Sequence, residues 1–345
     1  MRCAWLCALL VSTCGCSGVE DLGLRRENAS FGRMTLDLPA RGSAVFTAEG
    51  ASIVSSDGRA VCQFDWPSGR LERRLELDSG HSDPAVEPLC QSSDGQWIAA
   101  SCAAGRTLWL WDARTFQDAR RIVLDAPRIS ALCLSNSGQI FVGDEHGAIR
   151  RVDPERTGGS NSGASTIELS GPRVGEGSEL VFLALIADEH TLVGATRAGE
   201  SFACDARTGT TLWIDAGRRV LAIDPLHGRL LTLGALEGTV ELCELAAAGP
   251  PTFVRTLGPG AGSGAERLGL FVPDSELALI TRPMSALGTR WDELEIVDTR
   301  DEKVRGSVRL SAPLSLCAAR DGRYVISAEA RSAFVWDLEL LLAGR

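Results

Sequence analysis

The organisation of the chain is clearest in residues 80–112, which read GHSDPAVEPLCQSSDGQWIAASCAAGRTLWLWD. Two short apolar runs, Trp97–Ser101 and Thr107–Trp111, are separated by the small residues Ala103-Ala104-Gly105. Apolar runs of this length between turn residues indicate β-strands. A further turn at Asp94-Gly95 precedes the first run, and Asp112 follows the second. The stretch therefore predicts an antiparallel strand pair that begins after one turn and ends at an acid.

The same arrangement occurs seven times along the chain. Each copy ends in an aromatic, aliphatic or Cys residue followed by an acid: Phe64-Asp65, Trp111-Asp112, Val152-Asp153, Cys204-Asp205, Cys243-Glu244, Val297-Asp298 and Trp336-Asp337. The acids are 47, 41, 52, 39, 54 and 39 residues apart. Short strands between Gly, Asp and Asn turns at this period predict repeated four-stranded antiparallel units. No helical periodicity competes with these strands after residue 30.

These residues resemble the WD-repeat β-propeller family, whose unit ends in Trp-Asp and often begins with Gly-His. Gly80-His81 and Trp111-Asp112 carry both marks, Trp336-Asp337 carries one, and the other copies are degenerate. The family's hydrogen-bonded network also contains an Asp in the turn between the second and third strands, where this chain has Ala104, so that network is incomplete. The resemblance covers residues 32–345. It implies an all-β fold, a seven-bladed β-propeller of four-stranded antiparallel blades.

The ends of the chain predict how the ring closes. The last copy stops after its third strand, at Trp336-Asp337, so the seventh blade lacks an outer strand. Outer strands expected elsewhere are Arg70–Asp78, Arg120–Asp125 and Lys303–Leu310, and a matching stretch, Arg33–Leu38, precedes the first blade. We expect strand 33–38 to complete the last blade, because closure removes the exposed edges of an open array.

The first 16 residues, MRCAWLCALLVSTCGC, have the layout of an export signal. Arg2 precedes the apolar run Ala4–Val11, which is too short to span a bilayer. The segment resembles a bacterial lipoprotein signal, in which a small residue precedes the Cys that is lipidated. Gly15-Cys16 fits that pattern best and Thr13-Cys14 is the alternative. An ordinary cleaved signal and a buried N-terminal strand are the other interpretations.

The expected organisation is thus a signal peptide over residues 1–16, a polar tether over residues 17–31 and the propeller over residues 32–345. Cys16 is the expected lipidation site, and its acyl chains would be the protein's only attachment to a membrane. We expect an exported lipoprotein at the periplasmic or outer-membrane face.

Charge and composition narrow the classes of partner. The chain has 35 Lys and Arg against 45 Asp and Glu, a formal charge of −10, and Lys303 is its one lysine. A nucleic-acid binder needs a basic face for phosphates, so we expect no nucleic-acid partner. Hydrophobic residues make up 44% of the chain and charged residues 23%, which is typical of a protein that fills a core.

The seven cysteines beyond residue 16 are expected to pack in the core rather than to react or bind a metal. Cys90, Cys133 and Cys317 each stand four residues before a turn, which indicates one equivalent, inward-packed position in three blades. We expect buried free thiols, although an exported protein usually forms disulfides, and one bridge is the alternative. The four His residues fall in turns and lack the H-E-x-x-H spacing of a zinc site, so no metal or other cofactor is expected.

Signatures of catalysis are missing from the sequence. It contains no G-x-S-x-G elbow and no phosphate-binding G-x-x-x-x-G-K loop. Cys204–Trp213 resembles the repeat of pyrroloquinoline-quinone-type propellers, which include quinone-dependent dehydrogenases and lipoproteins that assist outer-membrane protein assembly. One copy of seven shows it, and a turn at Thr208-Gly209 explains it equally well. We therefore expect no enzymatic activity.

The resemblance to WD-repeat propellers implies that two kinds of loop share one face, the top rim: those from an outer strand to the next inner strand, and those from a second to a third strand. Gly171–Glu179, Pro259–Glu266 and Arg282–Asp292 are long insertions there, whereas Pro154–Gly163 lies on the opposite rim. Binding residues concentrate in loops on a rigid scaffold. The candidates are Arg282, Met284, Leu287, Arg290 and Trp291, with His81, Arg106, Arg128, His146, Arg197, Arg218 and Arg219. The alternative is that Trp291 covers its own blade and the arginines are solvated.

The sequence thus predicts a non-catalytic, monomeric scaffold of the bacterial cell envelope that binds another protein or an envelope complex through its top rim. The chief alternative is an outer-membrane-protein assembly accessory lipoprotein of the quinoprotein-like propeller type. A quinone-dependent dehydrogenase and a cytoplasmic WD-repeat interaction module are more remote.

Overall fold

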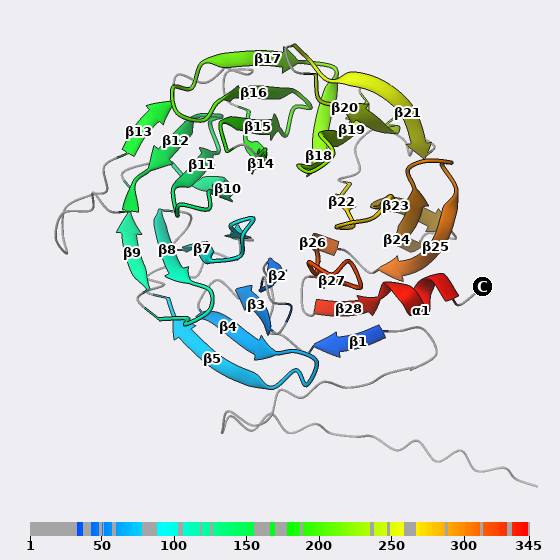
Figure 1. Cartoon of the computed structure of the whole chain (residues 1–345), viewed down its shortest axis with the longest axis horizontal. Helices are drawn as coiled ribbons and strands as arrows, with labels where there is room; N and C mark the ends of the chain where they lie inside the picture. Colours follow the sequence, from blue (N-terminus) through cyan, green and yellow to red (C-terminus); the bar gives the residue numbers. More distant parts are fainter. Residues whose placement is uncertain are drawn as a thin grey trace, which may run out of the picture.

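The computed structural model describes residues 33–36, 43–47, 50, 52–56, 60–77, 88–102, 106–117, 119–124, 127–154, 166–169, 178–186, 189–234, 238–246, 249–258, 267–286, 289–310, 313–329 and 333–343. In these ranges the chain forms seven sheets, each of four antiparallel strands, arranged in a ring around a central axis (Figure 1). The predicted seven-bladed β-propeller is therefore confirmed.

The blades follow one another around the ring in chain order, and each runs from an inner first strand to an outer fourth strand (Figure 1). Blade 1 contains β2 (Ala44–Phe46), β3 (Ser52–Ser56), β4 (Ala60–Asp65) and β5 (Leu71–Glu76). Blade 2 contains β6 (Leu89–Gln91), β7 (Trp97–Cys102), β8 (Thr107–Asp112) and β9 (Arg120–Val123). Blade 3 contains β10 (Ile129–Leu134), β11 (Ile140–Asp144), β12 (Ile149–Val152) and β13 (Thr166–Leu169).

The remaining blades repeat this order. Blade 4 contains β14 (Leu180–Leu185), β15 (Thr191–Thr196), β16 (Ser201–Asp205) and β17 (Thr211–Asp215). Blade 5 contains β18 (Arg218–Asp224), β19 (Arg229–Gly234), β20 (Val240–Glu244) and β21 (Thr252–Gly258). Blade 6 contains β22 (Gly269–Phe271), β23 (Leu277–Ala286), β24 (Thr289–Asp298) and β25 (Val304–Leu310). Blade 7 contains β26 (Pro313–Ala318), β27 (Tyr324–Glu329), β28 (Ala333–Asp337) and, as its outer strand, β1 (Arg33–Leu36).

The two ends of the propeller meet in blade 7. β1 pairs antiparallel with β28, with Arg33 opposite Trp336 and Leu36 opposite Ala333 (Figure 1). Closure of the ring by the N-terminal strand is therefore confirmed. The strand itself is described over Arg33–Leu36, and residues 37–38 of the predicted range lie outside the described residues.

The predicted outer strands are present but shorter than expected. The structure has Leu71–Glu76, Arg120–Val123 and Val304–Leu310 where the sequence indicated longer ranges. The reason is that each outer strand ends where its pairing with the third strand of the same blade ends. The seven predicted acid-ended segments all lie in, or directly after, third strands: β4, β8, β12, β16, β20, β24 and β28.

The core lies between neighbouring blades rather than at one centre. Phe46 of blade 1 packs in one cluster with Ile326 and Val335 of blade 7. In the same way Phe141 of blade 3 shares a cluster with Phe202 of blade 4. Burying one side chain of this size contributes about 1.5–3 kcal/mol. Each blade is therefore stabilised by its neighbours, and the first and last blades by each other.

The two blades that end in Trp-Asp differ in the hydrogen bonding of the Trp side chain, and Ala104 lies outside the described residues. In blade 7 the buried Trp336 donates its Nε1–H to Ser327 Oγ at 2.9 Å. In blade 2 the equivalent Trp111 is also buried, but Ala100 occupies the place of Ser327 in the strand register. Among the described residues, Trp111 Nε1 has no hydrogen-bond partner.

One short helix, which the sequence did not predict, follows the last strand at the C-terminal end of the propeller. Helix α1 (Leu338–Ala343) follows β28 directly, and Leu341 packs in the same cluster as Leu310 of blade 6. Asp337 Oδ1 accepts the backbone N–H groups of Glu339 and Leu340, at 3.0 and 3.3 Å, and so caps the first turn. A helix of six residues is too short to show a helical period in the sequence.

The seven cysteines of the propeller are free thiols. Cys62, Cys102, Cys133, Cys204 and Cys243 are buried, as predicted, while Cys90 and Cys317 are half-buried. Burial raises the pKa of the Cys133 and Cys204 thiols to about 12, which keeps them protonated and unreactive at neutral pH. Within the described part of the chain, no three His, Cys, Asp or Glu side chains gather where they could hold a metal ion.

Candidate functional site

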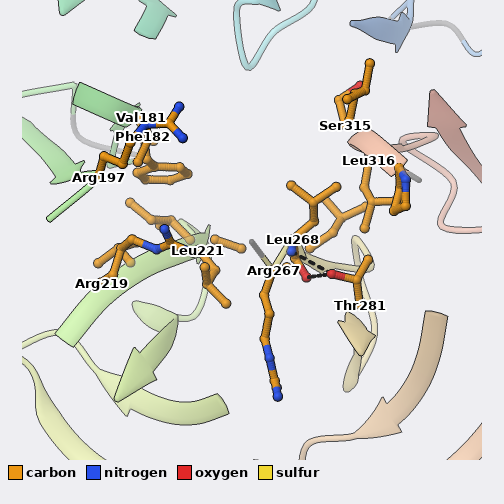
Figure 2. A pocket seen from close by; sticks show the side chains of 18 of the residues that line it. Val181, Phe182, Arg197, Arg219, Leu221, Arg267, Leu268, Thr281, Ser315 and Leu316 are labelled. Carbon is orange, nitrogen blue, oxygen red and sulfur yellow. Dashed lines mark hydrogen bonds between the residues drawn. The ribbon is translucent and has the colours of Figure 1, made fainter. Parts of the chain in front are cut away.

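A cavity of about 770 Å³ lies at the centre of the ring. Its wall is formed mainly by the first strands of blades 3 to 7, which surround the axis in Figure 1. Apolar side chains such as Val181, Leu221, Leu268 and Leu316 make up much of the lining (Figure 2). Among the described residues, the charged members of the lining are Arg128, Glu179, Arg197, Arg219, Arg267 and Asp292. The described part of the lining therefore combines apolar side chains with four arginines and two acids.

Three of these arginines come from consecutive blades. Arg197, in the turn between β15 and β16, donates from Nε to Glu179 Oε2 at 2.7 Å. Arg128, directly before β10, places Nη2 3.7 Å from Glu179 Oε1. Arg219 lines the cavity from β18, on the same side as Arg197 (Figure 2). We name Arg128, Arg197 and Arg219 the arginine arc. It brings three guanidinium groups to the cavity, two of which lie beside the carboxylate of Glu179.

Arg218 and Arg219 are neighbouring candidate residues, but their side chains have different surroundings. Arg218 donates to Glu241 Oε2 at 2.9 Å and to Asp215 Oδ2 at 3.2 Å, and neither acid lines the cavity. Arg219 lines the cavity together with Leu221, two residues further along β18. Successive side chains alternate across a strand, so the two neighbours face different surroundings.

Arg267 lies apart from the arc although it lines the same cavity. Its side chain is 4% exposed and runs away from the other labelled residues in Figure 2. Burial lowers the pKa of its guanidinium, nearby Arg282 lowers it further, and Glu295 acts in the opposite direction. Arg282 itself donates from Nη1 to Glu295 Oε1 at 3.0 Å. Arg267 therefore belongs to a charged cluster at the base of the blade 6 hairpin.

That hairpin has the longest second and third strands of the seven described blades. β23 and β24 have ten residues each, whereas their counterparts in the other blades have four to six. β24 pairs with β25 only from Asp292 onward, so Thr289–Trp291 pair with β23 alone. Met284 lies opposite Trp291 in this pairing, and Arg290 is exposed. The hairpin thus extends beyond the rest of its blade.

Trp291 is half-buried, because its own blade partly covers it. The Arg309 guanidinium of β25 lies 4.4 Å from the centroid of the indole ring, within cation–π range. The structure therefore supports one half of the alternative stated for this residue, that it packs on its own blade. The ring is nevertheless held in place by Arg309 and keeps an accessible surface.

The predicted rim residues fall into two groups that the fold brings together and several residues that lie apart. Arg282, Met284, Arg290 and Trp291 come together on the blade 6 hairpin, and Arg128 and Arg219 meet at the cavity. Arg106 is exposed in the β7–β8 turn, and the half-buried His146 donates its backbone N–H to Asp144 Oδ1 at 2.9 Å in the β11–β12 turn. Neither lines the cavity. Cys16, His81 and Leu287 lie outside the described residues or side chains.

The quinoprotein-like segment forms a structural turn. Asp205 Oδ1 accepts hydrogen bonds from the backbone N–H and the hydroxyl of Thr208, at 2.7 and 2.8 Å. Asp112 makes the same pair of contacts with Thr115 in blade 2, which lacks the rest of the motif. Trp213 is buried between blades 4 and 5. The turn between third and fourth strands thus accounts for these residues.

Sequence reasoning did not single out Arg267, Asp292 or the apolar lining. Arg128, Glu179 and Arg267 each lie within two residues before a first strand. A charged residue at this position of the repeat is therefore the sequence feature that these cavity-lining residues share. The connections before these strands differ in length, which hides the equivalence in the sequence. Burial raises the pKa of the Asp292 carboxyl, a shift that depends wholly on the fold.

Comparisons with known proteins support the fold and no more. No family model matches the chain, and none of the curated proteins is similar to it in sequence. Among solved structures, 1463 chains are similar, a breadth that marks a widely used fold. One is a chain of "Crystal Structure of Mitotic Checkpoint Complex", with a TM-score of 0.68, 17% identity, and coverage of 97% of this chain and 98% of that chain.

The fold and the cavity define the class: a seven-bladed β-propeller with a charged, partly apolar central cavity. The described part of the chain contains no helix long and apolar enough to cross a membrane.

Proposed function

We propose that this protein is a non-catalytic interaction scaffold of the bacterial cell envelope, and that it binds a protein partner through its top rim. The observation that carries the proposal is the blade 6 hairpin, which extends beyond its blade and presents Met284, Arg290 and Trp291. Trp and Arg are enriched among the residues that anchor protein interfaces, and an indole already held by Arg309 loses little freedom on binding.

The envelope part of the proposal rests on residues 1–16 and their likeness to a lipoprotein signal. The mass of the N-terminal peptide from the native host, measured separately for membrane and soluble fractions, tests it. A di- or triacylated peptide that begins at Cys16 supports the proposal. An intact Met1 in the soluble fraction contradicts export and directs the search to cytoplasmic partners.

Partner binding is tested by recovery of co-purifying proteins from that host with the full chain. Trp291→Ala and Arg290→Ala should reduce recovery of the same partner at least tenfold. Leu212→Ala is the matched control, because Leu212 is 50% exposed on the outer strand β17, away from the cavity lining and the hairpin. Equal recovery with the hairpin variants and the control would refute binding through this hairpin.

A further inference from the structure

We propose that Asp292 binds a basic side chain, Lys or Arg, of the partner protein, and that this side chain enters the central cavity beside blade 7. This inference rests on the proposed function and adds the chemistry of the partner. Asp292 lines the cavity and its neighbour Trp291 does not, because successive side chains alternate across a strand. A partner that contacts both faces of the blade 6 hairpin therefore reaches the cavity.

Asp292 differs from the next acids of β24 in having no partner. Glu293 accepts the Ser307 hydroxyl at 2.6 Å, and Glu295 accepts Arg282 Nη1 at 3.0 Å. Among the described residues, no hydrogen bond or ion pair reaches Asp292. Burial raises the pKa of its carboxyl, and no described charge acts against that shift. A carboxylate that is unpaired and partly removed from water is stabilised by an opposite charge.

The strand register directs Asp292 toward blade 7. Leu294, two residues further along β24, shares the same face of the sheet and packs in one cluster with Leu316 of β26. Leu314 and Leu316 line the cavity together with Asp292 (Figure 2 shows Leu316). The hydrocarbon stem of Lys or Arg packs along apolar surface while its charged end reaches a polar group. An acid beside apolar side chains therefore fits a basic side chain better than it fits a bare metal ion.

Charge on the rest of the molecule agrees with this assignment. The other acid of the described lining, Glu179, is already paired, at 2.7 Å from Arg197 Nε and 3.7 Å from Arg128 Nη2. The chain as a whole has a formal charge of −10, which attracts a basic partner over long range. Asp292 is thus the acid in the described lining that remains available to such a partner.

A displayed library of random nine-residue peptides, selected against the full-length protein, tests the proposal. We expect selected peptides to be enriched in Lys and Arg. Asp292→Asn should weaken binding of the best selected peptide by about 10-fold to 100-fold, as expected for loss of a hydrogen bond to a charged group. Glu293→Gln removes the same charge from the next residue, which does not line the cavity, and should leave binding unchanged.

A double-mutant cycle shows whether the two charges meet. Replacing the basic residue of the peptide by Met should weaken binding to the wild type as much as Asp292→Asn does, and should cause no further loss with Asp292→Asn. That variant removes no interaction within the described chain, so its Tm should equal that of the wild type or lie slightly above it. A Tm lower by more than about 2 °C would indicate an internal partner for the carboxylate and would overturn the argument.

The remaining outcomes also overturn the proposal. Selection of no peptides, of peptides without basic enrichment, or of basic peptides that bind Asp292→Asn as tightly as the wild type would each refute it. Calorimetric titration with cadaverine covers a free amine: tight cadaverine binding that depends on Asp292, with no basic peptide selected, would reassign the site to a small diamine. If these assays fail while Trp291→Ala still abolishes partner recovery, the proposed function stands and the basic side chain does not.

Discussion

The difference between the two tryptophans of blades 2 and 7 gives a quantitative prediction about stability. In blade 7, Val325 lies opposite Trp336, and two residues later Ser327 accepts the indole N–H at 2.9 Å. In blade 2, Ile98 lies opposite Trp111, and two residues later stands Ala100. Ala100 is fully buried, so the missing hydroxyl is not replaced by solvent.

Ser327→Ala should give blade 7 the arrangement of blade 2, in which an Ala stands where the Trp side chain would find a hydroxyl acceptor. It leaves the buried indole N–H of Trp336 without its Ser327 acceptor, which costs about 1–3 kcal/mol. Ala100→Ser should do the reverse and contribute about 0.5–1.5 kcal/mol, the net value of one intramolecular hydrogen bond. For a domain of this size, 1 kcal/mol corresponds to a change in Tm of about 2 °C. We therefore expect Tm to fall by about 2–6 °C in the first variant and to rise by about 1–3 °C in the second.

Thermal melts followed by circular dichroism measure both effects. Ser101→Ala is the matched control: Ser101 Oγ is buried next to Ala100 and has no hydrogen-bond partner among the described residues, so its removal should leave Tm unchanged or slightly higher. If Ala100→Ser lowers Tm, or if Ser327→Ala changes it no more than Ser101→Ala does, the reasoning from strand register is wrong.

Three further predictions concern packing, pH and ring closure. A Cβ at Gly194 would lie 2.3 Å from the ring of the buried Phe202, so Gly194→Ala should destabilise the fold by about 1–3 kcal/mol in urea unfolding, whereas Gly258→Ala meets no atom within 4 Å and should be close to neutral. Hydrogen bonds from the side chain and backbone of Arg300 and from Arg305 hold the pKa of the Asp298 carboxyl well below its usual value. The contribution of Asp298 to stability is therefore present above about pH 4 and is lost as the pH falls through the folded-state pKa. Between pH 5, 4 and 3, the urea midpoint should fall less steeply with pH for Asp298→Asn than for the wild type, and equal slopes would contradict this. Removal of residues 32–39 deletes the strand that pairs with β28 and should sharply lower Tm relative to a chain that begins at residue 32, and an unchanged melt would argue against closure by β1.

Much of the fold could be predicted because each blade is specified locally. The acid at the end of each third strand and the turn before each second strand lie within one repeat, and their period survives even where the Trp-Asp motif has become Cys-Glu. Closure followed from counting strands, since the sequence of the seventh blade contains three strands and Arg33–Leu36 supplies the fourth. The short helix α1 was not predicted, because six residues are too few to show a helical period. Its N-cap, Asp337, also belongs to the Trp-Asp pair that marks the end of a strand.

The candidate site was less predictable, because its residues come from different blades. The sequence indicated that arginines gather in the rim connections, but not that Arg128 and Arg197 would share Glu179, which is contributed by a third connection. Adjacent residues could not be distinguished either: Arg218 pairs with Glu241 while Arg219 lines the cavity. Which of the two faces inward depends on the phase of β18 and on the irregularity in its register between Val220 and Ala222.

The sequence by itself therefore determined the repeat, the number of blades and the strand that closes the ring, because these follow from short-range patterns of apolar, turn and acidic residues. The tertiary structure alone decided which charged side chains meet at the central cavity and which are neutralised elsewhere. The physical reason is that the meeting depends on strand phase and on the placement of five inner strands around one axis, and these are fixed only when the packed blades form a ring.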